Sequence, residues 1–468
     1  MGRILGYYIM PHPPIIIPEI GKGEEQKAKK TIDACCKVSE EIEKLKPDTI
    51  IIITPHGPIF EDAIAIKNEN EFIGSLENFG VNEVKIRLKG NESLTEDIFI
   101  KAQAEDINTI LIDKKREELY DIEEGLDHGA IVPLYFINKN YIQYKLVHIT
   151  YGLLYDTELY RFGKIIKEVV EKSNFNVVVI ASGDLSHKLS HEGPYGYMKE
   201  GKVFDEKILT LLERGQVEEI FGLDKGLTEA AGECGLRSFY ILLGTIDGKK
   251  FLGNTLSYEG PFGIGYGVMK FNVDEESIKE NVIDKIEKRK KDKIKRIREE
   301  ESIYVKLARE SLEGFINTGE YIEVPSYIDE KMLREKRGVF VSLKKDGVLR
   351  GCIGTIAPTT DNIAKEIIRN AVEAGSMDPR FIPVRREELE CLTYSVDEIM
   401  PGEKCEKQDL NPKKYGVIVR NGFKTGLLLP DLDGVDTIEE QLDISLRKAG
   451  IGHNEKYTIE RFQVIRHH

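Results

Sequence analysis

The 468-residue sequence has only six cysteines, no long apolar run and a minority of basic residues. Six cysteines without a C-x-x-C pair are too few for a disulfide framework in a chain of this length, so we expect reduced thiols. A membrane helix needs about 18–20 consecutive apolar residues, and no segment approaches that length. The first residues, MGRILGYYIM, show no small-residue cleavage site of a signal peptide. We therefore predict a cytoplasmic protein.

The shortage of basic residues bears on the partners. Lys and Arg number 67 against 81 Asp and Glu, which gives a formal net charge of −14. Nucleic acids and anionic membranes repel such a chain unless its bases are gathered locally. We therefore expect neither a membrane nor a nucleic acid as a partner.

Short runs of β-branched residues alternate with helical patterns through the first part of the chain. The strand candidates are 5–10, 49–54, 109–113, 145–150 and 176–182. Because these runs lack polar alternation, they are typical of strands covered on both faces. The later part has helices and hairpins without this alternating order. We predict an α/β N-terminal domain with a mixed sheet flanked by helices, followed by an α+β C-terminal domain.

A strongly charged segment separates the two parts. From Asp284 to Glu301 the chain has nine basic and six acidic residues among 18. Their interleaving, without aromatic residues, favours a solvated helix that links domains over a nucleic-acid-binding arm. We predict an N-terminal domain over residues 1–275, a charged helical linker over 276–302 and a C-terminal domain over 303–468.

Several histidines lie in loop-like segments next to the predicted strands. His12 follows the first strand, His56 directly follows TIIIIT, and His187 lies just beyond NVVVIAS. The carboxyl ends of strands in an open α/β sheet form the edge where ligands bind, so this placement indicates a metal or active site. His128, in a Gly-containing segment, is a fourth candidate. His148 alternates inside a strand, and we assign it to packing.

The segment AGECG, residues 231–235, offers a third ligand to two imidazoles. Glu233 would complete the two-histidine, one-carboxylate set of non-haem Fe(II) sites. Cys234 as the ligand would instead favour softer metals such as Zn or Cu. A helix start capped by Glu233 is the structural alternative, and the sequence leaves this choice open.

In this order, MPHPPIIIPEIG, TPHG, DHGA, ASGDLSH and AGECG resemble the class III extradiol ring-cleavage dioxygenases of the LigB type. They most resemble the Memo-like branch, over about residues 1–275. The resemblance implies that His12, His56 and Glu233 bind iron. It also implies that His128 and His187 are acid/base and substrate-contact residues. In Memo-like proteins the third ligand position resembles a cysteine, which here is Cys234.

Four strings in the second half resemble another family. LRGCIGT, MDPRF, GLLLP and RKAGI are similar to the AMMECR family over about residues 300–466. This resemblance implies a fold and little chemistry. Proteins similar to the two halves, together with a radical-SAM-like protein, form the AmmeMemoRadiSam system, and this chain resembles a fusion of the first two members.

These resemblances imply two main functions. The first is an oxidoreductase that uses Fe(II) to open a catechol-like aromatic diol and incorporates both atoms of dioxygen. In it, His187 would take a phenol proton and return it, while His128 would hydrogen-bond an oxygen atom. The second is a metal- or redox-binding module that acts with partners such as the radical-SAM-like protein. A third hypothesis is modification of RNA or protein by the C-terminal domain.

Overall fold

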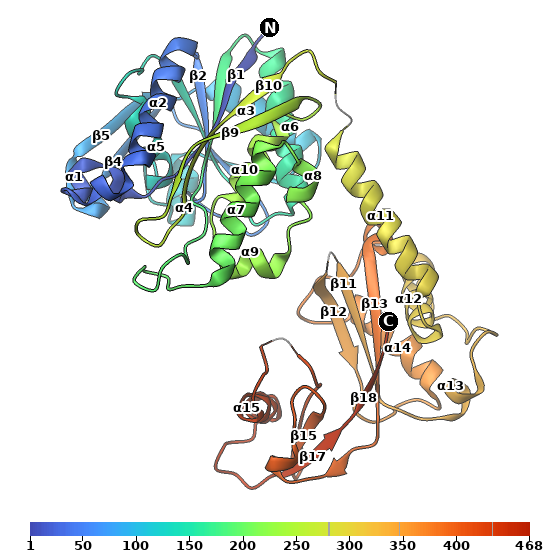
Figure 1. Ribbon diagram of the computed structural model, residues 1–468. Coiled ribbons are helices and arrows are strands. Elements are labelled where there is room, and N and C mark those ends of the chain that lie inside the picture. Colours follow the sequence, from blue (N-terminus) through green and yellow to red (C-terminus); the bar gives the residue numbers. More distant parts are fainter. Residues whose placement is uncertain (279–280, 346, 433) are drawn as a thin grey trace. The chain divides into compact units, whose positions relative to one another are not determined.

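The computed structural model describes residues 1–278, 281–345, 347–432 and 434–468 (Figure 1). The chain divides into two compact units, unit 1 (Met1–Ile286) and unit 2 (Glu287–His468). Helix α11 (Val282–Glu300) contains this division and overlaps the expected linker, of which residues 279 and 280 lie outside the described residues. The domain boundaries expected from the sequence stay a prediction, which limited proteolysis can test.

Unit 1 is built around a mixed sheet. Within the described residues, eight strands are hydrogen-bonded in the order β6-β3-β7-β2-β8-β1-β10-β9, and β4 pairs with β5 in a separate hairpin. The strands are β1 (Arg3–Met10), β2 (Thr49–Thr54), β3 (Ile64–Lys67), β4 (Glu71–Leu76), β5 (Val81–Lys89), β6 (Thr109–Ile112), β7 (Lys145–Thr150), β8 (Asn176–Ser182), β9 (Lys250–Glu259) and β10 (Tyr266–Asp274).

Helices connect and cover these strands. They are α1 (Pro18–Gly21), α2 (Lys29–Leu45), α3 (Glu92–Ala104), α4 (Lys114–Tyr120), α5 (His128–Ile137), α6 (Asp156–Lys172), α7 (Lys199–Glu213), α8 (Val217–Ile220), α9 (Lys225–Ala231) and α10 (Leu236–Gly244). Across the whole described part of the chain, no helix has the length and apolarity required to span a bilayer.

The central strands are buried on both faces. In β2, Ile51 and Ile53 belong to the core that includes α3, α6 and α10, whereas Ile50 and Ile52 belong to the core that includes α2 and α5. Successive side chains of a strand point to opposite faces, so a continuous apolar run is needed to fill both cores. Figure 1 shows α2 and α5 on one side of the sheet and α6 and α10 on the other. The predicted α/β fold is confirmed.

Unit 2 combines antiparallel sheets with helices. Within its described residues, the sheet orders are β12-β11-β13-β18 and β14-β17-β15-β16. The core of the first sheet includes residues of α12 and α14, and that of the second includes residues of α15, so the α+β prediction is confirmed. The elements are α12 (Ile303–Thr318), α13 (Glu330–Arg334), β11 (Val339–Lys345), β12 (Val348–Gly354), α14 (Ile363–Ser376), β13 (Leu392–Ile399), β14 (Glu403–Lys404), β15 (Gly416–Asn421), β16 (Lys424–Leu428), α15 (Ile438–Ala449), β17 (Thr458–Phe462) and β18 (Val464–His467).

Two residues of the LRGCIGT string, Arg350 and Gly351 on β12, are explained by contacts inside unit 2. A Cβ atom at Gly351 would lie 2.1 Å from the carbonyl oxygen of Ala374, so α14 can approach the strand only if this residue is glycine. Arg350 binds Glu388 through Nε–Oε1 at 3.1 Å and Nη2–Oε2 at 2.9 Å. Burial alone would raise the pKa of Glu388, but the hydrogen bonds and charge of Arg350 lower it to about 2.

Candidate metal centre

Four parallel strands bring the predicted site loops to one edge of the unit 1 sheet. β7, β2, β8 and β1 are neighbours and run parallel. Met10 pairs with Ser182 and Thr54 pairs with Thr150, so the carboxyl ends of the strands lie close together. His12 lies two residues beyond β1, His56 lies two residues beyond β2, and the loop with His187 follows β8. His128 instead begins α5, and Cys234 lies between α9 and α10. The loops therefore meet at the carboxyl edge of the sheet.

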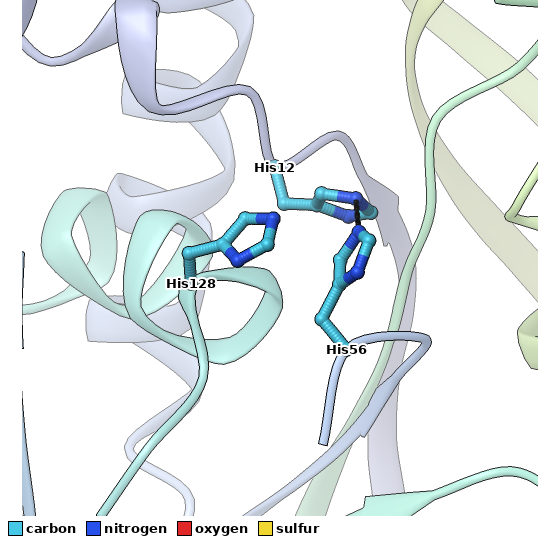
Figure 2. Close-up of side chains that lie close together, drawn as sticks. All are labelled: His12, His56 and His128. Carbon is cyan, nitrogen blue, oxygen red and sulfur yellow. Dashed lines mark hydrogen bonds between the residues drawn. The ribbon is translucent and has the colours of Figure 1, made fainter. Parts of the chain in front are cut away.

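Three imidazoles meet at this edge. The Nε2 atoms of His12 and His56 are 2.9 Å apart. The His128 ring stacks on the His56 ring with centroids 4.1 Å apart, and its centroid is 5.6 Å from that of His12. One ring nitrogen from each residue lies within 4.8 Å of the others, and Figure 2 shows the rings facing one another. The structure thus places His128, which we expected as an acid/base or substrate-contact residue, beside the two histidines.

The His12 ring is oriented by the end of β8. Its backbone N–H donates to Oδ1 of Asp184 at 3.0 Å, and its Nδ1 is 3.0 Å from Oγ of Ser182. The Ser182 hydroxyl donates its single hydrogen to the carbonyl oxygen of Gly129, so it must accept a hydrogen bond from His12 Nδ1–H. We assign the proton to Nδ1 on this hydrogen-bond pattern, which leaves the Nε2 lone pair facing His56.

The cluster is electrically neutral at neutral pH. Burial and the neighbouring imidazoles lower the pKa of His12 well below its ordinary value. The same causes lower the pKa of His56 to about 4. Burial also lowers the pKa of His128, against the opposing charge of Asp127. Neutral imidazoles keep a lone pair for a metal ion, so the electrostatics suit coordination.

The two adjacent candidates for the third ligand have different surroundings. Sγ of Cys234 lies 3.7 Å from Nε2 of His12 and accepts a hydrogen bond from the backbone N–H of Asp184 at 3.4 Å. The carboxylate of Glu233 accepts a hydrogen bond from the backbone N–H of Leu236 at 2.6 Å, at the start of α10. Burial raises the pKa of the Cys234 thiol well above its ordinary value and that of the Glu233 carboxyl to about 7.

Two glycines allow the loop with Cys234 to reach the loop after β8. A Cβ atom at Gly183 would lie 2.3 Å from Cα of Gly235. In turn, a Cβ atom at Gly235 would lie 3.0 Å from the carbonyl oxygen of Asp184 and 2.5 Å from the Phe239 ring. The glycines of ASGDLSH and AGECG are thus backbone contacts between the two loops. This contact holds Cys234 near His12.

His187 lies on the continuation of the loop after β8. Its backbone N–H donates to the carbonyl oxygen of Ala231 at 3.2 Å, and its ring centroid is 5.1 Å from that of Tyr195. Its Nε2 is buried and has no hydrogen-bond partner among the described residues. Burial lowers the pKa of His187, and its proximity contributes to the lowered pKa values of His12 and His56. His187 therefore belongs to the same neighbourhood as the cluster.

Sequence reasoning did not single out Asp184. This residue is 4% exposed, and its Oδ2 atom lies 3.8 Å from Nε2 of His12. Burial raises the pKa of its carboxyl to about 7, against the effect of the hydrogen bond from the backbone of His12. A signal was available, because Asp184 lies in ASGDLSH only two residues beyond β8.

A cleft of about 1110 Å³ opens beside His56 and His128. Its walls include the β4–β5 hairpin and α4. Charged side chains are numerous along it, with carboxylates such as Glu69 and Glu77 outnumbering lysines. Phe79 adds an apolar contact, since its ring centroid is 5.3 Å from that of His128. A ligand in this cleft would meet His56 and His128 directly.

The donor atoms fit a transition metal ion. Two nitrogen ligands with bonds of about 2.1 Å lie about 3.0–3.4 Å apart on one ion, depending on the angle between them. The His12 and His56 Nε2 atoms are 2.9 Å apart, about 0.1 Å short of this range, so a small movement of either ring would let both bind one ion. A nitrogen and a sulfur ligand in a tetrahedral site lie about 3.6 Å apart, and Cys234 Sγ is 3.7 Å from His12 Nε2.

The fold and this cluster define unit 1 as an α/β domain with a candidate metal centre at its sheet edge. Residues 6–269 match the family model described as the catalytic LigB subunit of aromatic ring-opening dioxygenase. Residues 305–467 match the AMMECR1 family model. The chain therefore belongs to the LigB family, with an AMMECR1 domain in its C-terminal part.

The chain is similar to one protein over its whole length and to others over about a third of its length. Protein CA_C1420 of Clostridium acetobutylicum is 52% identical over 466 residues, which cover 99% of this chain and 98% of that protein. A protein of Thermotoga maritima is 46% identical over 168 residues, which cover 34% of this chain and 97% of that protein. The crystal structure of protein PH0010 from Pyrococcus horikoshii is 32% identical with a TM-score of 0.33, covering 35% of this chain and 88% of that chain.

Proposed function

We propose that unit 1 binds one transition metal ion through His12, His56 and Cys234. The distance of 3.7 Å between the Cys234 sulfur and His12 Nε2 is the observation that carries this proposal. The alternative ligand, Glu233, has its carboxylate engaged by the backbone N–H of Leu236. Two imidazoles with a thiolate favour Zn or Cu, whereas Glu233 in place of the thiolate would favour Fe(II).

Metal analysis of anaerobically purified variants of Glu233 and Cys234 tests which of these two adjacent residues is the third ligand. We expect Cys234→Ser to lose stoichiometric metal, because a hydroxyl is a poor ligand for a soft ion. Glu233→Gln should keep its metal, because the amide oxygen can still accept the hydrogen bond from Leu236. The opposite result would assign Glu233 as the ligand and support an Fe(II) site.

We further propose that unit 1 performs oxidative chemistry on a small aromatic diol, in line with the ring-opening activity that names its family. A redox-active ion would supply the positions where a chelating diol and dioxygen bind. His187 is neutral near pH 7 because burial lowers its pKa. Its Nε2, which has no hydrogen-bond partner within the described part of the chain, can therefore take a phenol proton and return it. His128, which lines the cleft, would hydrogen-bond an oxygen atom of the substrate.

Oxygen uptake against a panel of catechols tests this activity, with the parent protein loaded with iron or with copper, the redox-active ions that the two candidate ligand sets favour. Removing a general base typically costs about 10²–10⁴-fold in rate, so His187→Ala should keep its metal and lose most ring cleavage. His191→Ala, at an exposed position in the same segment, is the matched control and should retain the rate of the parent. The proposal fails if neither the iron-loaded nor the copper-loaded parent consumes oxygen with any catechol.

A metal- or redox-binding module without dioxygenase activity is the second candidate. The observation that favours it is the charged lining of the cleft beside His56 and His128, since an aromatic ring is usually held between apolar walls. Its partner would be the radical-SAM-like protein of the AmmeMemoRadiSam system. Size-exclusion chromatography of the two purified proteins tests this, and bound metal without oxygen uptake would favour it over the first candidate.

A further inference from the structure

A buried polar network lies beside the histidine cluster, and the proposed function does not use it. His148, on β7, is 0% exposed, and the sequence suggested only a packing role for it. Its Nε2 lies 2.8 Å from Oδ2 of Asp127. An ionised carboxylate only accepts hydrogen bonds, so His148 Nε2 must carry the hydrogen in this contact.

Asp127 holds the first turn of α5. Its Oδ1 accepts a hydrogen bond from the backbone N–H of Ala130 at 3.2 Å, which makes it the N-cap of this helix. His128 is the first residue of α5 and immediately follows the cap. The direction in which the His128 side chain leaves the helix therefore depends on Asp127.

The same carboxylate also holds the loop that carries His56. The hydroxyl of Thr54 donates to Oδ1 of Asp127 at 2.6 Å and accepts from the backbone N–H of His56 at 3.2 Å. A hydroxyl has one hydrogen, and it must go to Asp127 because the carboxylate cannot donate. The lone pairs of the hydroxyl remain for His56. Asp127 is thus linked by hydrogen bonds to the segments of both His56 and His128.

Two glycines make room for this network. A Cβ atom at Gly129 would lie 2.3 Å from Oγ1 of Thr54 and 2.8 Å from Oδ1 of Asp127. A Cβ atom at Gly57 would lie 2.0 Å from Oγ1 of Thr150, at the end of β7. The glycine that follows the histidine in both TPHG and DHGA therefore allows the hydrogen-bonded loops to approach one another.

We propose that Asp127, oriented by His148, is a positioning residue that sets the placement of His56 and His128 relative to His12. When the proposed site holds a metal ion, the hydrogen bonds of this network fix the orientation of the His56 imidazole that binds it. Such outer partners commonly change metal affinity by about 10–100-fold when they are removed. The role in metal binding rests on the proposed function, whereas the hydrogen bonds of Asp127 and His148 are present without a metal.

The test compares two substitutions of the buried histidine. Glutamine at position 148 keeps an N–H donor within reach of Asp127, whereas leucine has similar bulk and no donor. We expect His148→Leu to weaken Zn²⁺ binding about 10–100-fold in a competition titration with a chromophoric chelator. His148→Gln should bind Zn²⁺ like the parent protein. The ligand-field spectrum of the Co²⁺ form should change in the leucine variant and not in the glutamine variant.

The readouts separate positioning from simple stability. A merely structural role would lower the melting temperature of His148→Leu and leave its Zn²⁺ affinity and Co²⁺ spectrum unchanged, which would overturn the proposal. If the parent protein bound neither Zn²⁺ nor Co²⁺, the proposed metal binding would fail instead. The positioning role is then judged from a crystal structure of metal-free His148→Leu. An unchanged His12–His56 Nε2 separation of 2.9 Å would overturn it.

Discussion

The contact between the two glycine loops leads to a quantitative prediction for Gly183→Ala. The new Cβ atom would lie 2.3 Å from Cα of Gly235 and 3.3 Å from its backbone N and C atoms. Non-bonded carbon atoms prefer separations of about 3.5–4.0 Å, so the loops must separate by at least about 1.2 Å. The atoms that the new methyl group meets are all backbone atoms of Gly235, so no side-chain rotation can relieve the clash.

The displacement would reach the proposed ligand directly. Cys234 precedes Gly235, and its sulfur is 3.7 Å from His12 Nε2. Metal–ligand bonds tolerate about 0.2 Å, so a shift of about 1 Å should cost at least tenfold in metal affinity. Overpacking of this kind costs about 1–3 kcal/mol in the free energy of unfolding. For a unit of this size, that corresponds to roughly 2–4 °C of melting temperature per kcal/mol.

Differential scanning calorimetry of the metal-free protein and a Zn²⁺ competition titration measure the two effects separately. Gly222→Ala is the matched control, because its Cβ atom would meet nothing nearer than the carbonyl oxygen of Glu219 at 3.4 Å. We expect the control to match the parent protein in both assays. If Gly183→Ala also matches the parent, the loops are not in the close contact described, and the explanation of both glycines is wrong.

Three further predictions concern the ligands, an ion pair and the charged helix. His12→Ala and His56→Ala should each abolish stoichiometric metal binding with unchanged circular dichroism, and unchanged metal content in both would contradict the metal site. The pKa of Glu388 is lowered from 4.5 to about 2 in the folded chain, so its ionised form stabilises unit 2 above about pH 4.5, and this contribution is lost as the pH falls toward 2. Glu388→Gln should therefore lower the free energy of unfolding at pH 7 by about 2–3 kcal/mol. In urea titrations, the free energy of unfolding of the variant should fall less steeply below pH 4.5 than that of the parent. An equally steep fall in both proteins would refute this reasoning. Trypsin should cut first in or near Val282–Glu300 and release stable fragments of roughly 30 and 20 kDa, and degradation without them would argue for a shared core.

The central strands could be predicted from the sequence because both of their faces are buried. TIIIIT and NVVVIAS coincide with β2 and β8, since a strand between two layers of helices needs apolar residues at every position. β3 was missed because it has only four residues, Ile64–Lys67, and includes the buried Lys67. β5 was also missed, although most of its length alternates between buried and exposed residues, which is typical of a strand covered on one face.

The candidate site was only partly predictable for a different reason. Strand ends can be located in a sequence, so His12 and His56 could be placed at one edge of the sheet. The directions of adjacent side chains cannot be located in this way. The sequence therefore left Glu233 and Cys234 as equally possible third ligands. The structure distinguishes their surroundings through the turn at Gly232, which has a φ of +62°, and the start of α10 at Leu236.

His148 shows the limit of local patterns most clearly. Its alternation within β7 indicates a buried residue, and it is indeed 0% exposed. Its partner Asp127 is 21 residues away in the chain, and no local sequence pattern predicts a hydrogen bond between the two residues. A buried polar side chain needs a hydrogen-bond partner, however, so each predicted buried histidine implies a second polar residue elsewhere.

The motifs that carry the family resemblance contain glycines that allow close approach of the loops, as well as side chains that could bind a metal. In TPHG and DHGA the glycine follows the histidine, and in ASGDLSH and AGECG glycines flank the loop contact that holds Cys234. At Gly57, Gly129, Gly183 and Gly235 alike, an added Cβ atom would lie within 2.5 Å of another loop, strand end or helix. Parallel strands bring the loops to a common edge, but only residues without side chains let the loops approach closely enough for imidazole and thiol groups to hold the proposed ion. The glycines are therefore part of the candidate site, because they set the separations on which coordination depends.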